Sequence, residues 1–203
     1  ECLAKLNGMF VFALCDKGSQ KVFFARDRAG EKPLFYSYNN GTIRFGSELK
    51  SLLADPKFPR NINRRSLDIL LSNGYIAGDE CILKGVNKLA PGHAMIFDLN
   101  TSELKKWRYW NLPEFDYSLK TNEFDLLDEL EYLLNDSVKK QLVADVPVGV
   151  LLSGGVDSSI VTALASRNAS NVKTFTVSFP GHNKFDESSH AKLIANHFGT
   201  EHT

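Results

Sequence analysis

The heptad Ser153-Gly154-Gly155-Val156-Asp157-Ser158-Ser159 decides the fold of the second half of this chain. The run 146–152 before it is apolar without alternation, which predicts a strand buried on both faces, as in a parallel sheet. Two glycines permit a sharp turn, and the Asp-Ser-Ser that follows consists of residue types that accept hydrogen bonds from free N–H groups at a helix start. A helical pattern continues to about Arg167. Strand, turn and helix N-terminus together predict an anion-binding site.

The residues of this turn exclude two common nucleotide-binding loops. No lysine lies between Leu151 and Ser170, so the Walker ending Gly-Lys-Ser/Thr is absent, as is the dinucleotide pattern G-x-G-x-x-G. The heptad resembles the SGGxDSS loop of ATP pyrophosphatases, which grips the pyrophosphate end of ATP. A tight turn with hydroxyl caps and no ligand is the alternative interpretation.

Composition and charge exclude several other classes of protein. The 203 residues are 43% hydrophobic, which is enough for one large domain or two small ones. Lys plus Arg and Asp plus Glu are 24 each, so no overall field favours nucleic acid or an anionic membrane. The three cysteines show no CxxC spacing, which argues against a disulfide framework and a zinc site and fits a reducing cytosol. No apolar run approaches the roughly 20 residues of a membrane span, and we expect a cytoplasmic protein.

The first half carries the short alternating runs of an antiparallel β-rich unit. Four predicted strands follow one another across turns, which indicates a meander. Two short helices and a further strand come next. The strands are expected at 8–14, 21–26, 34–38, 42–45 and 93–97, and the helices at 47–53 and 65–72.

The character of the sequence changes at 111–120, where Pro113 and charged residues interrupt the periodicity. We therefore predict a linker at 113–120 between a domain at 1–112 and a domain at 121–203. Because the chain starts inside an apolar pattern and stops just after a predicted helix, we expect an internal piece of a longer protein.

The second half reads as the opening of a doubly wound parallel sheet. Apolar residues recur at three- and four-residue steps from Phe124 to Leu142, which predicts a long helix. A second apolar strand at 172–179 completes a βαβ unit, and Asp186 is expected to cap a helix that Gly199 ends. Ligands of such sheets bind at the carboxyl ends of the strands, so the loops after both strands should face one site.

Both halves resemble the glutamine-hydrolysing asparagine synthetase family, with matching stretches in the same order over nearly the whole chain. The resemblance implies an N-terminal-nucleophile-type αββα sandwich portion, the C-terminal part of a class II glutamine amidotransferase domain. It further implies a doubly wound parallel α/β portion of the adenine nucleotide α-hydrolase type, the N-terminal part of the ATP-binding domain. The stretches are LNGMF (6–10), RDRAGEKPL (26–34), FGSELK (45–50), LAPGH (89–93), DVPVGVLL with the heptad (145–159), TFTV (174–177), FDE (185–187) and HFGTEH (197–202).

The resemblance implies a reaction in two steps. One half releases ammonia from glutamine, and the other activates aspartate with ATP as a β-aspartyl-adenylate that ammonia attacks. A carboxylate is a poor electrophile, so adenylation gives it a good leaving group, and a closed site keeps ammonia away from water. The implied partners are aspartate, glutamine and ATP, without nucleic acid or membrane, the cofactors are ATP and Mg²⁺, and a homodimer is the assembly considered.

The same resemblance assigns residues to the ATP site. Asp157 is expected to bind Mg²⁺, because a carboxylate that faces pyrophosphate needs a hard cation between them. A helix cap is the alternative role for Asp157. The implied ATP-binding residues are Leu151, Ser153, Gly154, Gly155, Asp157, Ser158, Ser159 and Val177.

For glutamine the resemblance implies a binding residue but no catalytic residue in this chain. The family nucleophile is a cysteine at the mature N-terminus, well upstream of the strand at 8–14, so Cys2 is not assigned to that role. Asn7 falls where several members carry an aspartate that holds the glutamine amino group, and it can accept that bond without the charge. A turn-entry asparagine is the alternative. We interpret 26–28 as a structural turn with internal ion pairs.

Two further functions stay open. Amidotransferases that act on other carboxylates, and β-lactam or peptide-cyclising synthetases, carry similar loops, and the residues that select the acceptor would lie beyond Thr203. A non-catalytic nucleotide-binding homologue is the other alternative.

Overall fold

The computed structural model describes residues 1–114, 122–179, 181 and 186–203. The chain divides into two compact units, Glu1–Phe115 (unit 1) and Asp116–Thr203 (unit 2), which are described separately. Most of the predicted linker at 113–120 lies outside the described residues. No helix in the described ranges combines the length and the apolar character needed to cross a bilayer.

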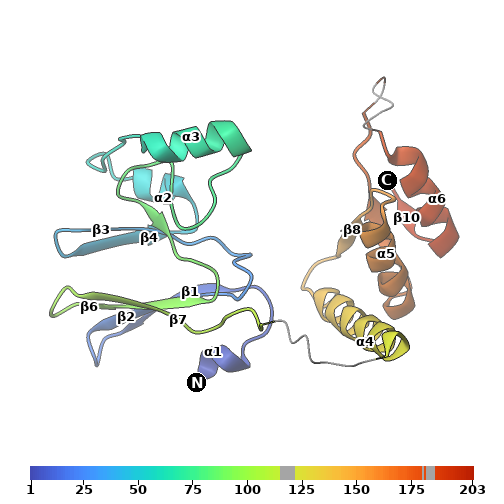
Figure 1. Ribbon diagram of the computed structural model, residues 1–203, viewed down its shortest axis with the longest axis horizontal. Helices are drawn as coiled ribbons and strands as arrows, with labels where there is room; N and C mark the ends of the chain where they lie inside the picture. Colours follow the sequence, from blue (N-terminus) through green and yellow to red (C-terminus); the bar gives the residue numbers. More distant parts are fainter. Residues whose placement is uncertain (115–121, 180, 182–185) are drawn as a thin grey trace. The chain divides into compact units, whose positions relative to one another are not determined.

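Unit 1 is built from two antiparallel sheets that face each other (Figure 1). Sheet A has the strand order β1-β2-β6-β7, and sheet B has the order β4-β3-β5. The strands of sheet A are β1 (Val11–Asp16), β2 (Lys21–Arg26), β6 (His93–Asp98) and β7 (Leu104–Arg108), and those of sheet B are β3 (Phe35–Asn39), β4 (Thr42–Gly46) and β5 (Asn87–Lys88).

The predicted meander is wrong, because the chain changes sheet after β2. Strand β2 pairs with β6, with Phe24 opposite Met95, rather than with β3. The turn at 27–33 causes the change, since the carboxylate of Asp27 accepts hydrogen bonds from Glu31 N (2.9 Å) and Lys32 N (3.0 Å) and so directs the chain out of sheet A. Two separate hairpins, β1-β2 and β3-β4, result.

Helices cover the outer faces of the two sheets. Leu3 of α1 (Cys2–Lys5) packs with Ala25 and Ala94 on the outside of sheet A. Helix α2 (Leu49–Leu53) packs through Leu52 into a second cluster, to which Phe35 of sheet B contributes, and α3 (Arg64–Asn73) lies in the same layer (Figure 1). Unit 1 is therefore layered helix, sheet, sheet, helix. The core between the sheets consists of Phe24, Leu34, Tyr36, Leu89, Met95 and Phe97.

The described residues of unit 2 form a three-stranded parallel sheet with three helices, which confirms the predicted βαβ unit. Its strand order is β10-β9-β8, so that α5 connects two neighbouring strands and α6 connects the next pair. Asn122 begins α4, because its side chain accepts from Phe124 N at 3.1 Å, and Gly199 ends α6 with φ 64°. The elements are α4 (Glu123–Gln141), β8 (Gly149–Leu151), α5 (Val156–Asn168), β9 (Lys173–Phe175), α6 (Ser188–Phe198) and β10 (Glu201–His202).

The prediction that the strand before the heptad is buried on both faces is wrong. Leu152 packs against Ala191 and Ala195 of α6, but Leu151, which points to the opposite face, is 79% exposed. Phe175, the pairing partner of Leu151, is also exposed. The sequence pattern shows that both faces are apolar, but in the described structure only one of them receives helices.

Candidate functional site

The loop between β8 and α5 has one position that only glycine can occupy. Gly154 has φ 84°, in the left-handed region that favours glycine. A Cβ atom there would lie 2.6 Å from His190 Cβ and 2.8 Å from Ala191 N. Both contacts belong to the first turn of α6, so the loop rests directly on that helix.

Hydroxyl groups fix the shape of the loop from within. Ser158 Oγ accepts from Ser153 N (3.3 Å), donates to Gly155 O (3.1 Å) and lies 3.1 Å from Ser153 Oγ. Ser153 Oγ in turn accepts from Gly155 N at 3.3 Å. The predicted role of Ser158 as an acceptor for N–H groups at the helix start is wrong, because its hydroxyl accepts from the loop N–H of Ser153 instead. The loop is therefore shaped before any ligand binds.

The first turn of α5 supplies free donors next to this loop. The helix begins at Val156, three residues before the predicted start at Ser159. The N–H groups of Val156, Asp157 and Ser158 consequently lack acceptors within the helix, and the positive end of the helix dipole points the same way. Together with the glycine turn, this arrangement suits a phosphate group.

Asp157 lies in this first turn and is exposed. The N-cap position belongs to Gly155, and within the described residues no side chain caps α5, so the alternative of a helix cap is wrong for Asp157. A single carboxylate fits Mg²⁺, which is commonly held by one or two carboxylates together with phosphate oxygens. The described residues contain no group of three His, Cys, Asp or Glu able to hold a metal by themselves, so an ion at Asp157 would take its other ligands from phosphate oxygens and water.

A cavity of about 350 Å³ opens beside Ser153 at the carboxyl ends of β8 and β9. It brings together three of the predicted ATP-binding residues, Leu151, Ser153 and Val177. The other five, at positions 154, 155 and 157–159, continue from Ser153 into the loop and the first turn of α5 and do not line the cavity. The complete lining is Leu151, Leu152, Ser153, Phe175, Thr176, Val177, Phe179 and Glu187.

Five lining residues were missed by sequence reasoning, and the first, Leu152, directly follows β8. Phe175 and Thr176 lie at the end of β9, and the rule that ligands bind at strand carboxyl ends could have found them. Phe179 and Glu187 come from opposite ends of the segment between β9 and α6. Their presence confirms that the two predicted loops face one site, although 180 and 182–185 lie outside the described residues.

Asp186 joins the two ends of that segment. Its Oδ2 atom accepts from Ser178 Oγ (2.9 Å) and Phe179 N (3.3 Å), and its Oδ1 atom accepts from Ser188 N (2.9 Å). The hydrogen bonds of Ser188 and then Ser178 lower the pKa of Asp186 to about 2. The prediction that Asp186 caps α6 is wrong, because the N-cap position is Glu187, although Asp186 accepts from the N–H of Ser188, the first residue of the helix.

In unit 1, Asn7 is exposed between α1 and β1 and is followed by Gly8 with φ 98°. It does not line any cavity described in that unit. The turn at 26–28 is structural, as expected, but backbone carbonyls rather than ion pairs hold Arg26. Its Nε donates to Lys32 O (2.7 Å) and its NH1 to Leu89 O (2.6 Å).

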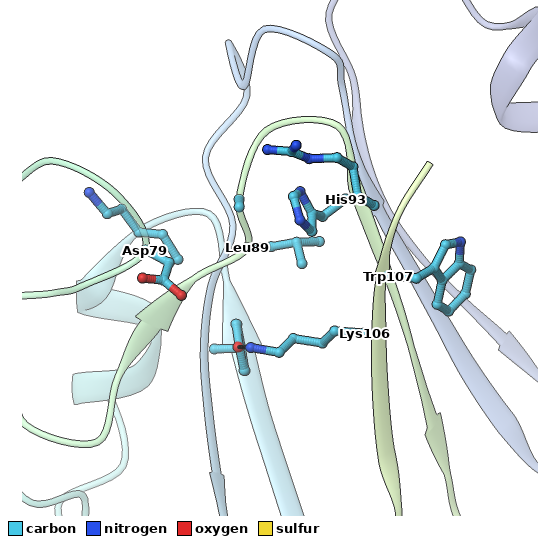
Figure 2. A pocket seen from close by; sticks show the side chains of 9 residues that line it. Asp79, Leu89, His93, Lys106 and Trp107 are labelled. Atoms are coloured by element: carbon cyan, nitrogen blue, oxygen red, sulfur yellow. Dashed lines mark hydrogen bonds between the residues drawn. The ribbon is translucent and has the colours of Figure 1, made fainter. Parts of the chain in front are cut away.

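Unit 1 has a cavity of about 370 Å³ between the two sheets. Figure 2 shows Lys106 and His93 on either side of Leu89, with Asp79 across from them. Lys106 Nζ already donates to Tyr36 OH at 2.9 Å, and Lys88 Nζ donates to Ile76 O at 2.7 Å. Both lysines that line this cavity therefore already donate hydrogen bonds to groups of unit 1.

Comparison with known proteins gives two family matches. The glutamine amidotransferase domain family matches residues 1–110, and the asparagine synthase family matches residues 129–203. A putative asparagine synthetase [glutamine-hydrolyzing] 2 of Methanocaldococcus jannaschii is 36% identical over 206 residues, which cover 100% of this chain and 39% of that protein. Asparagine synthetase [glutamine-hydrolyzing] 3 of Bacillus subtilis is 35% identical, and the match covers 93% of this chain and 31% of that protein. Amidase chyE of Penicillium rubens is 33% identical, and the match covers 98% of this chain and 31% of that protein. The chain therefore spans about a third of the length of these relatives.

Proposed function

Because this chain belongs to the glutamine-hydrolysing asparagine synthetase family, we propose that it is part of an ATP-dependent ligase that amidates aspartate with ammonia from glutamine. The proposed route passes through a β-aspartyl-adenylate. The observation that carries the proposal is the cavity in which Leu151, Ser153 and Val177 meet beside the N-terminus of α5. It offers an apolar wall and an anion-binding loop side by side, as a nucleoside triphosphate requires.

We assign the two units to the two halves of this reaction. Residues 1–112 form the C-terminal part of a class II glutamine amidotransferase domain, and residues 121–203 the N-terminal part of the ATP-binding domain, with a linker at 113–120. The helix, sheet, sheet, helix layers of unit 1 support the N-terminal-nucleophile-type sandwich. The parallel β8-β9-β10 sheet supports a doubly wound fold of the adenine nucleotide α-hydrolase type.

The polyphosphate of ATP would lie on the loop. The N–H groups at the start of α5, that of Ser158 among them, and the hydroxyls of Ser153 and Ser159 would be the donors, because the Ser158 hydroxyl donates to Gly155 O. Gly154 and Gly155 leave room for the phosphates. The adenosine end would lie against Leu151 and Val177. Phe175 and Phe179 extend that apolar wall, and apolar side chains suit a purine ring.

Asp157 would hold Mg²⁺ at the edge of this loop. When bound, the ion neutralises the charge that develops on the departing pyrophosphate. The carboxylate would keep the ion at the helix start, next to the N–H donors that would bind the phosphates. The proposed cofactors are therefore ATP and Mg²⁺.

Glutamine would bind to unit 1, where the side-chain oxygen of Asn7 is the proposed acceptor for its amino group. Since Asn7 carries no charge, it should hold that ammonium less firmly than a carboxylate would. Glutamine, aspartate and ATP are cytosolic small molecules, and we accordingly place the protein in the cytoplasm.

One comparison favours a second candidate function. Amidase chyE matches 98% of the chain and bears the name of a different reaction. Both units thus occur in a protein that is not named an asparagine synthetase. The second candidate is an amidotransferase that activates another carboxylate with the same ATP site.

The test uses the full-length protein with ATP, Mg²⁺, glutamine and aspartate, and measures pyrophosphate and asparagine. The first candidate predicts both products in equal amounts. Pyrophosphate that forms only with carboxylates other than aspartate would support the second candidate. If no carboxylate yields pyrophosphate, both candidates are wrong.

A further inference from the structure

The cavity in unit 2 has two walls, and both of them rest on the first turn of α6. What we call the phosphate wall is the heptad loop, which meets the cavity at Ser153 and continues away from it. A Cβ on Gly154 of this loop would lie only 2.6 Å from His190 Cβ, so the loop lies directly on that turn. The apolar wall is the end of β9 and the segment that directly follows it, from which Phe175, Val177 and Phe179 line the cavity. The separation of the walls thus depends on how each is attached to α6.

Asp186 is the attachment of the apolar wall. One carboxylate oxygen accepts from Ser178 Oγ and Phe179 N in the segment after β9, while the other accepts from Ser188 N at the start of α6. The neighbours of these residues, Val177 and Glu187, line the cavity, although Asp186 itself does not. A single ionised side chain therefore connects the apolar wall to the helix that supports the phosphate wall.

We propose that Asp186 is a positioning residue for ATP, which sets the separation between the pyrophosphate loop and the apolar wall. This inference rests on the proposed function. ATP must touch both walls at once, so a misplaced wall weakens the binding of the intact nucleotide, while a ligand that touches only one wall is unaffected. The low pKa of Asp186, about 2, keeps both oxygens available as acceptors at neutral pH.

The test compares three probes on the full-length protein by calorimetry: ATP, inorganic pyrophosphate and adenosine, all with Mg²⁺. In Asp186→Asn, one acceptor oxygen is replaced by an NH₂ group. We expect the Kd of ATP to rise about tenfold, while the Kd values of pyrophosphate and adenosine stay within about twofold. Ser178→Ala, which removes a single bond to Asp186, should shift ATP affinity in the same direction by a smaller factor.

Ser189→Ala is the matched control, since Ser189 is an exposed residue on the same turn of α6. It should leave all three affinities unchanged. Unchanged ATP affinity in Asp186→Asn would overturn the inference, and so would a parallel loss for all three probes, which would indicate general damage to the unit. If the unsubstituted protein binds no ATP, the proposed function itself fails, and that result is visible before any variant is made.

Discussion

At the scale of single residues, the buried carboxylate of Asp27 shows how one side chain organises unit 1. Asp27 is only 1% exposed and accepts from the backbone N–H groups of Phe10, Glu31 and Lys32. Burial by itself would raise its pKa, but the hydrogen bonds from Lys32 and Glu31 outweigh that effect, and the pKa lies below 3.8. Asp27 is therefore charged at neutral pH and fixes the turn that separates the two sheets.

Asp27→Asn should destabilise unit 1 by about 2–3 kcal/mol, because an amide has one acceptor oxygen and turns an NH₂ group toward backbone donors. Urea unfolding at pH 7 measures the change. Asp68→Asn, at an exposed position of α3, is the control and should alter the free energy of unfolding by less than about 0.5 kcal/mol. Equal effects of the two substitutions would contradict the role given to Asp27.

The lowered pKa of Asp27 also fixes the sign of its pH dependence. A carboxyl group whose folded pKa lies below its unfolded value stabilises the fold above the unfolded value, 3.8, and loses this contribution as pH falls through the folded pKa. Stability of the unsubstituted protein should therefore fall more steeply below about pH 4 than that of Asp27→Asn.

At the scale of elements, the sequence predicts the bounds of a strand where residues next to it in the chain form the turns that end it. Strand β2 has the predicted bounds, Lys21–Arg26, because a turn limits it at each end. Strands β8 and β9 are shorter than predicted, at three residues each, because the ladder between them runs only from Gly149 opposite Lys173 to Leu151 opposite Phe175. An apolar run in the sequence indicates which residues are buried, but the length of the strand is set by backbone pairing with the neighbouring strand.

The residues of the candidate site also fall into those that the sequence predicts and those that it does not. The heptad is contiguous, so the glycine turn and the helix start follow from the sequence directly, and Val177 follows from the family resemblance. Phe179 and Glu187 reach the cavity through the bonds of Asp186, which join positions seven or eight residues apart. Hydrogen bonds of this kind produce no repeating pattern in the sequence, so they could not be predicted from it.

The two glycines of the heptad should respond differently to alanine. In Gly154→Ala, the new Cβ would meet backbone and Cβ atoms of α6 at 2.6–2.8 Å with φ at 84°, so the loop must move off the helix. We expect a loss of about 2–4 kcal/mol in the stability of unit 2. Gly155→Ala, where φ is −71° and the new atom lies 3.4 Å from Ser153 Oγ, should cost less than about 1 kcal/mol.

Thermal and urea unfolding of both variants test this difference. Because the two substitutions add the same methyl group at adjacent positions, composition cannot explain a gap between them. Equal stabilities would show that the loop does not rest on α6 through Gly154.

At the scale of the whole molecule, the proposed reaction assigns one step to each unit. Under this proposal, glutamine binding would depend on unit 1, and ATP binding would depend on unit 2. Free ammonia can replace the product of the first step, whereas nothing replaces the activation of the carboxylate. The nitrogen donor used in an assay therefore reports which unit a substitution damages.

Asn7→Ala and Asp157→Ala should separate these steps in the full-length protein. With glutamine as donor, Asn7→Ala should lower asparagine formation about tenfold, because a hydrogen bond to an ammonium group is lost. With ammonium chloride as donor it should match the unsubstituted protein.

Asp157→Ala should lower asparagine and pyrophosphate formation at least about a hundredfold with either donor, since the proposed metal ligand is gone. Asp136→Ala, at an exposed carboxylate of α4, is the control and should change neither activity. If Asp157→Ala impaired only the glutamine reaction, or Asn7→Ala impaired both, the assignment of one step to each unit would be wrong.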